Sequence, residues 1–96
     1  MTVIILVSAP PALRGEISRW AIEPHPGVFV AELSALVREK LWQRCCKKIR
    51  DGGVIFIYSD ANEQGYTIRY HGNTKRDFID LDGIILPRQP NDKESK

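Results

Sequence analysis

The chain opens with a continuous run of aliphatic residues, Val3 to Val7. A run of this kind, without polar alternation, predicts a strand over residues 2–7 that is buried on both faces. Two prolines follow, and the second, Pro11, suits the first turn of a helix because an N–H has no partner there. Apolar residues then recur at helical spacing. The predicted helix buries a face made of Leu13, Ile17, Trp20 and Ala21.

A second helix is predicted after a short strand. Prolines at positions 24 and 26 predict a turn that ends the first helix, and the strand follows at Val28–Ala31. Ser34 is a typical N-cap, and a pair of glycines ends the second helix near Asp51. Its apolar positions repeat every four residues. They are Val37, Leu41, Cys45 and Ile49, with Trp42 and Cys46 beside them.

Three extended segments complete the chain. Val54–Tyr58 is an apolar run and Tyr66–Tyr70 alternates apolar and polar residues, which predicts one buried and one half-buried strand. Ile79–Leu86 is also extended and is broken at Gly83. The resulting order, β-α-β-α-β-β-β, favours an α+β sandwich of the ferredoxin-like class. In it two helices cover one face of a four- to five-stranded sheet, which is mixed or antiparallel.

The last extended segment is left over from this arrangement. A spare edge strand exposes unpaired backbone groups, so we expect it to be exchanged or added across a homodimer. We assign residues 1–87 to a single domain and residues 88–96 to a polar tail without periodicity.

Composition narrows the class of protein. With 96 residues, of which 43% are hydrophobic and 27% charged, the chain has the size and balance of one globular domain. Its longest apolar run is far short of the roughly 20 residues that a membrane span needs. Two cysteines are too few for a disulfide scaffold, and two distant histidines argue against a zinc site. A reducing, cytoplasmic location fits these features best.

The net charge of +2 is unevenly distributed, because residues 12–50 carry +4 and residues 51–96 carry −2. A basic half suggests an anionic partner. The cations of interest occur in three places, the first turn of the first helix, the start of the second helix and a loop: Arg14, Arg38 and the pair Lys75 and Arg76. Phosphate contacts are one interpretation of each. The alternative for Arg14 is a proline-started helix in which Gly15 allows close packing against the sheet, and for the others it is a solvated helix face or loop.

Two aspartates near the end of the chain offer a different chemistry. Asp80 and Asp82 point to the same face if residues 79–82 are extended. Two carboxylates on one face suit magnesium, which prefers oxygen ligands. In the alternative interpretation, Asp82 lies in a turn with the following glycine, and Asp80 caps it or pairs with a basic residue.

Four segments, in order and at similar spacing, carry a resemblance to a known family. They are Pro-Pro-Ala-Leu-Arg-Gly at 10–15, Gly-Val-Phe-Val at 27–30, Ser-Ala-Leu-Val-Arg-Glu-Lys-Leu-Trp at 34–42 and Asp-Leu-Asp-Gly at 80–83. Together they resemble the CRISPR-associated protein Cas2 of type I-E systems, over roughly residues 2–87. The resemblance implies a ferredoxin-like homodimer in the spacer-acquisition complex. There it lies between two dimers of the integrase Cas1 and supports the midsection of a double-stranded DNA.

Carried over residue by residue, the resemblance implies that four cations contact the DNA backbone: Arg14, Arg38, Lys75 and Arg76. Two further cations of the family are lost, because Ala12 and Leu36 stand in their places. Residues 84–90 match the stretch that contributes to the integrase contact. A scaffold of this kind binds any duplex through its phosphates and requires no cofactor.

The family is also described as a metal-dependent endonuclease, which is the alternative function. That activity relies on an acid at the end of the first strand, where this chain has Leu6-Val7-Ser8-Ala9. Without a carboxylate, Mg²⁺ or Mn²⁺ has no anionic ligand there. We therefore assign no catalytic residue and no metal ligand, and a divalent cation enters only in the nuclease alternative. A small ligand-binding or regulatory domain of the same fold is a third hypothesis.

Overall fold

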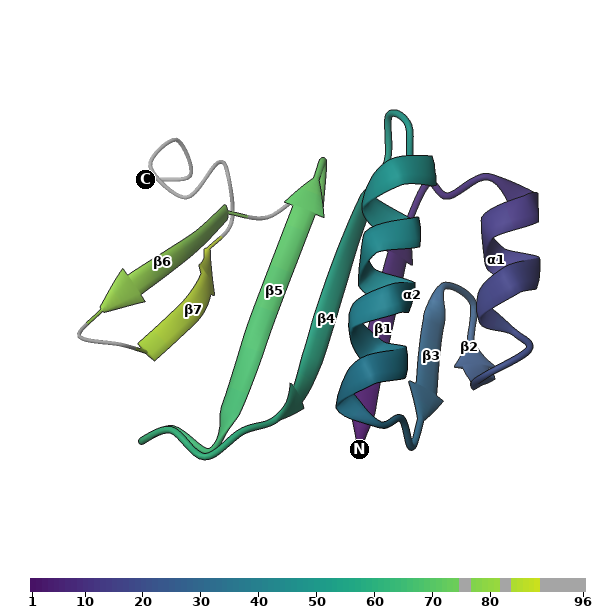
Figure 1. Cartoon of the computed structure of the whole chain (residues 1–96). Helices are drawn as coiled ribbons and strands as arrows, with labels where there is room; N and C mark the ends of the chain where they lie inside the picture. The colour runs from purple at the N-terminus through teal and green to yellow at the C-terminus, as the bar shows by residue number, and fades with distance from the viewer. Residues whose placement is uncertain (75–76, 82–83, 89–96) are drawn as a thin grey trace.

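The computed structural model describes residues 1–74, 77–81 and 84–88, and the side chains of residues 1–74. Two helices and seven strands follow one another along the described residues (Figure 1). In order they are β1 (Thr2–Val7), α1 (Pro11–Ile17), β2 (Ile22–His25), β3 (Val28–Ala31), α2 (Ala35–Lys48), β4 (Gly53–Ser59), β5 (Tyr66–Gly72), β6 (Asp77–Leu81) and β7 (Ile84–Arg88).

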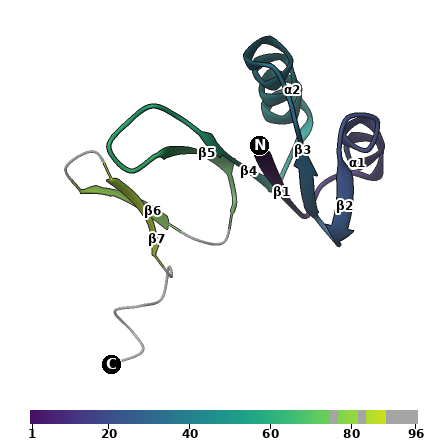
Figure 2. The ribbon, with the colours of Figure 1, turned by 90° about the horizontal axis from the view of Figure 1, so that it is seen from below.

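Five strands form one antiparallel sheet in the order β2-β3-β1-β4-β5. Both helices lie on the same face of this sheet, as the view in Figure 2 shows. The α+β, ferredoxin-like prediction is therefore confirmed. The first strand has antiparallel neighbours on both sides, β3 and β4, so no parallel pair joins it to the next strand along the chain.

Strand β2 was missed by the sequence analysis, which predicted a turn there. Its sequence is Ile-Glu-Pro-His, and every residue in it is exposed. It pairs with β3 only at Ile22–Val30 and His25–Val28, with a shift of register between them. A proline removes a backbone donor, and a strand at the edge of a sheet tolerates that loss because one side of it has no neighbour.

The core lies between the sheet and the helices. Its members are Ile4, Leu6, Leu13, Ile17, Phe29, Leu41, Cys45, Ile49, Val54 and Phe56. Strand β1 alternates strictly, with Thr2, Ile4 and Leu6 buried and the residues between them half-buried. The prediction that this strand is buried on both faces is therefore wrong, because helices cover only one of the two faces.

Both helices end earlier than predicted. Helix α1 stops at Ile17. The next residues form a tight turn, in which the Trp20 N–H donates a hydrogen bond to the Ile17 carbonyl at 2.9 Å. Trp20 is consequently 53% exposed instead of lying on a buried helix face. Helix α2 stops at Lys48, short of Asp51, and Arg50 takes a left-handed backbone conformation with φ of 58°.

The ends of β1, β4 and β5 meet in a tight junction of backbone. A Cβ on Gly52 would collide with the carbonyl oxygens of Val7 and Ser8, and one on Gly53 would collide with Asn73. Gly72 has φ of 79°, and the next residue donates its N–H to the Gly52 carbonyl at 3.0 Å. The glycines therefore fix the place where the chain leaves β5, two residues beyond the predicted end of that strand.

Strands β6 and β7 pair with each other in a separate two-stranded sheet, from Asp77–Arg88 to Leu81–Ile84. The predicted extended segment around Gly83 is therefore a hairpin, and its second strand reaches Arg88. Residues 75–76, 82–83 and 89–96 lie outside the described residues.

Candidate nucleic-acid interface

Arg14 lies in the middle of α1 and forms an ion pair with Glu23 of β2. The distance between the Arg14 guanidinium and Glu23 Oε2 is 2.6 Å, and the same oxygen accepts the Gly27 N–H at 2.8 Å. The pKa of Glu23 is lowered, first by the Gly27 hydrogen bond and then by Arg14. Arg14 still exposes 45% of its side chain. A ligand can therefore reach a guanidinium that a carboxylate already holds in place.

Arg38 lies in the first turns of α2, where a cation opposes the helix dipole. Its guanidinium carbon lies 3.8 Å from the centre of the Tyr58 ring on β4. Its Nε is buried and has no hydrogen-bond partner among the described residues. The carboxyl pKa of Asp60 is lowered, mainly by hydrogen bonds from Thr67 and Ala61 and to a smaller degree by Arg38. An aromatic face and a nearby carboxylate therefore hold this cation against the dipole.

The other two predicted cations, Lys75 and Arg76, lie outside the described residues. The chain reaches them through Asn73 and Thr74, which follow the glycine junction at the end of β5. The described segment that leads to them stops at Thr74, at the end of the sheet where α2 finishes, whereas Arg38 lies at the end where α2 begins.

Arg14 and Arg38 are not brought together within one chain. Arg14 contacts the outermost strand on one side, β2, and Arg38 contacts β4. Two strands, β3 and β1, separate those strands in the sheet. A single compact anion cannot bind both residues, so only an extended ligand or a second copy of the chain unites them.

A further cationic cluster, between α1 and α2, was missed by the sequence analysis. Glu16 of α1 accepts two hydrogen bonds from Arg44, at 2.6 and 2.9 Å, and one from Lys48 at 3.0 Å. These bonds, that of Arg44 foremost, lower the pKa of Glu16 to about 2. The helical spacing of Arg44 and Lys48 places them on one face of α2, but which acid faces them depends on how the helices pack.

On the opposite flank of α2, Arg69 of β5 forms an ion pair with Glu39. Its guanidinium carbon also lies 4.4 Å from the centre of the Trp42 ring. Trp42 in turn packs edge-on against Phe56, with ring centres 5.1 Å apart. This stack joins α2 to β4 and β5, so Arg69 is part of the packing and carries no unpaired charge.

The end of β1 contains no carboxylate that could bind a metal. Ser8 stands there, exposed and in a left-handed conformation with φ of 56°. Among the residues whose side chains are described, no three histidines, cysteines or acids gather as a metal site would require. The side chains of Asp80 and Asp82, the alternative ligands, lie outside the described residues.

The face of the sheet that the helices leave open is apolar. Strands β1, β4 and β5 present Val3, Ile57 and Ile68 on it, in register with one another. A groove of about 420 Å³ crosses this face, and its lining comprises Met1, Val3, Ile57, Tyr58, Ser59, Tyr66 and Ile68. No charged side chain of the described residues lines this groove, so its chemistry suits another apolar surface and not a nucleic acid.

Comparison with known protein families gives a match over most of the chain. The model of a CRISPR-associated protein family, Cas_Cas2CT1978, matches residues 1–86. The chain belongs to this family. The match covers the five-stranded sheet, both helices and most of the β6–β7 hairpin. Membership agrees with the Cas2 resemblance and supports a CRISPR-related role. No helix among the described residues has the length and apolar character needed to cross a membrane.

Proposed function

We propose that this Cas2-family protein is a dimeric, sequence-independent scaffold for double-stranded DNA in CRISPR spacer acquisition, bridging Cas1 integrase dimers. The observation that carries the proposal is the contrast between two sites. Arg14 and Arg38 are held by partners yet remain partly exposed, whereas the end of β1 has Ser8 where metal-dependent hydrolysis would need an acid. Arg14 and Arg38 can each contact a phosphate, whereas the end of β1 lacks the carboxylate that would hold a metal.

A second copy of the chain is part of this proposal. The open face of the sheet presents apolar side chains from β1, β4 and β5, and the β6–β7 hairpin stays outside the five-stranded sheet. Apolar sheet faces are stable when another layer covers them. A two-fold partner on this face doubles the four cations to eight. It also places copies of Arg14 and Arg38 at several points along one duplex.

The test is the salt dependence of duplex binding. Eight phosphate contacts predict a slope of about −7 in a plot of log affinity against log salt, at about −0.9 per contact. Changing Arg14, Arg38, Lys75 and Arg76 to Ala together should bring this slope close to zero and leave the complex with Cas1 intact. The control removes two cations of the C-terminal segment, Lys93→Ala and Lys96→Ala, and should keep the slope. A slope near −1 for the unchanged protein contradicts the proposal.

The nuclease alternative is tested by a separate cleavage assay. It requires cleavage of RNA or duplex DNA that depends on Mg²⁺ or Mn²⁺ and that disappears in the double variant Asp80→Asn and Asp82→Asn. If the unchanged protein cleaves the nucleic acid and the double variant does not, the scaffold proposal is wrong and the protein is a nuclease. We expect no metal-dependent cleavage by either protein.

A further inference from the structure

The outer side of the helical layer carries a groove between α1 and α2 that the proposed duplex site does not use. It has a volume of about 490 Å³. Its apolar lining is Trp20, Val37 and Leu41, and its cations are Arg19, Lys40 and Arg44. We refer to these six residues, together with Glu16, as the α1–α2 groove. The volume lies within the range of small-ligand sites, which begins at about 300 Å³.

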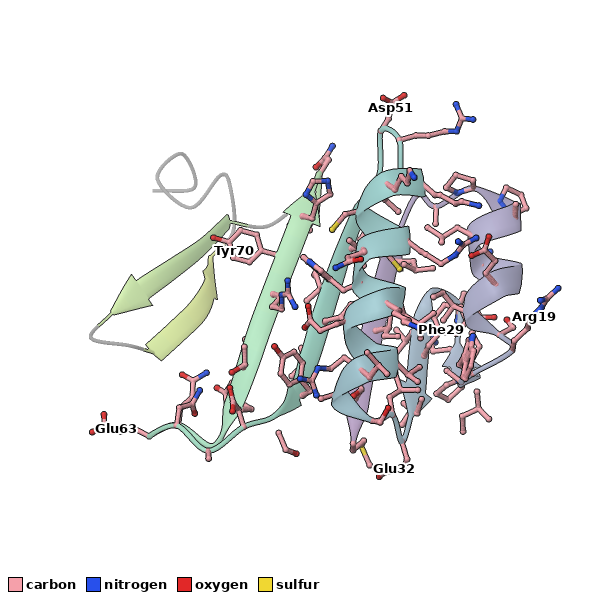
Figure 3. All side chains as sticks on the ribbon, in the orientation of Figure 1. Arg19, Phe29, Glu32, Asp51, Glu63 and Tyr70 are labelled. Carbon is pink, nitrogen blue, oxygen red and sulfur yellow. The ribbon has the colours of Figure 1, made fainter. Side chains whose placement is uncertain are left out.

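The charge of the α1–α2 groove is positive and largely uncompensated. Its one acid, Glu16, is occupied by Arg44 and Lys48. Arg19 and Lys40 form no ion pair with any residue in the described part of the chain. Arg19 projects outward beyond the end of α1, as Figure 3 shows. Two cations are therefore available to an anionic ligand at this groove.

The positive surface continues beyond the groove along α2. The next hollow on the helix is lined by Lys40, Gln43, Arg44 and Lys47. A third, of about 440 Å³, lies where α2 ends beside the start of α1, and its cations are Lys47, Lys48 and Arg50. From Lys40 to Lys47 the helix rises by roughly 10 Å, at 1.5 Å per residue. A row of cations of this length suits an extended polyanion better than a single small anion.

Trp20 gives the groove a second kind of contact. It is 53% exposed, because α1 ends at Ile17 and leaves the indole at the rim of the groove. An exposed indole beside cations is the combination that proteins use to hold single strands. Bases stack on the ring, and the backbone follows the positive groove. A duplex keeps its bases stacked inside and would leave the indole without this contact.

We propose that the α1–α2 groove binds a single-stranded nucleic acid. One base stacks on Trp20, and adjacent phosphates contact Arg19 and Lys40, with the strand continuing toward Lys47. The groove lies on the helical layer, and the face proposed for a second copy is the opposite side of the sheet. Each protomer of a dimer therefore keeps its own strand site. The inference does not depend on the proposed duplex site, because the two share no residue.

Tryptophan fluorescence tests the proposal directly. The chain has two tryptophans, and Trp42 is partly covered by Phe56 and Arg69. An oligothymidylate added to the full chain should quench the emission of Trp20 and saturate. Trp20→Leu should abolish that quenching and weaken binding about 5- to 150-fold, the effect of losing one stacked base. Arg19→Ala with Lys40→Ala should reduce the salt slope by about 1.4, at about 0.7 per phosphate of a single strand.

Three controls test whether the quenching arises at this groove and from a nucleic acid. The variant lacking Arg14, Arg38, Lys75 and Arg76 should keep the quenching unchanged, so failure of the duplex proposal and of this one are distinguishable. The Arg19 and Lys40 substitutions are on exposed side chains, so circular dichroism should show an unchanged fold even if Trp20→Leu were destabilised. Quenching that is absent, or that polyglutamate reproduces at equal concentration, overturns the proposal. In the second case, the groove binds an acidic polypeptide instead.

Discussion

The two faces of the five-stranded sheet bury their side chains by different means. On the face toward the helices, Ile4, Val54 and Phe56 are fully buried by α1 and α2. On the other face, Val3 and Ile57 occupy equivalent positions in the same strands and remain half-buried beside an open groove. The chain thus completes one core by itself. The other face is apolar and incompletely covered by the described residues, because Val3 and Ile57 stay half-buried there although Ile55 and Ile68 are buried. This difference is the physical basis for expecting a dimer.

The largest expected effect is a loss of stability caused by a substitution on the face that the helices cover. Phe56→Ala removes a ring that has no exposed surface and that packs against Trp42. We expect a loss of about 3–5 kcal/mol in the free energy of unfolding, measured by urea denaturation. A loss below about 1 kcal/mol would contradict the view that this face forms a closed core.

A substitution on the open face should weaken dimerisation and leave the folding of the single chain unchanged. Val3→Glu puts a carboxylate into the apolar groove, where a second copy would have to bury it. We expect the dimer to dissociate, with a dissociation constant raised at least about tenfold, or about 1.4 kcal/mol. Sedimentation equilibrium measures this change.

The matched control is Leu36→Glu on α2, an apolar residue that is 66% exposed on the helical layer. It should leave the dimer intact. Equal dissociation in both variants would mean that the added charge, and not the open face, is responsible. The comparison between the two faces would then lose its functional meaning.

The smallest expected effect concerns the outer side of the helical layer and depends on pH. The hydrogen bonds from Arg44 and Lys48 lower the pKa of Glu16 from 4.5 to about 2. A carboxyl with a lowered pKa stabilises the fold above its ordinary pKa, and this contribution is lost as the pH falls toward the lowered value. Glu16→Gln should therefore flatten the fall in thermal stability between about pH 4.5 and pH 2. Parallel curves for the two proteins would contradict this assignment.

Much of the fold could be predicted because the apolar periodicity is strong. The spacing of Val37, Leu41, Cys45 and Ile49 places the buried side of α2 correctly. Strand β2 could not be predicted in this way, since Glu23 and its proline and histidine neighbours show no apolar alternation. Only the neighbouring strand β3 makes that segment extended. Trp20 was misplaced for a related reason, because helical spacing alone does not show where a helix ends.

The sequence was enough to predict which cations belong to the candidate site but not which residues they pair with. Arg14 and Arg38 were identified as candidate phosphate contacts near the starts of helices. Their partners, Glu23 and Tyr58, come from strands that lie elsewhere in the sequence. The sheet order that brings them together is a tertiary property. The same limit applies to Glu16, whose pairing with cations of the second helix depends on how the two helices pack.

The glycine junction has a practical consequence for anyone who modifies this protein. Because Gly52 and Gly53 face backbone carbonyls and not solvent, this corner has no space for an inserted peptide, a label or even a methyl group. The turn between β4 and β5 is the opposite case. It exposes Glu63 (Figure 3), although Gly65 in the same turn has φ of 88° and should stay glycine. Tags and fluorophores belong in that turn, at the far end of the sheet from the segment that leads to Lys75.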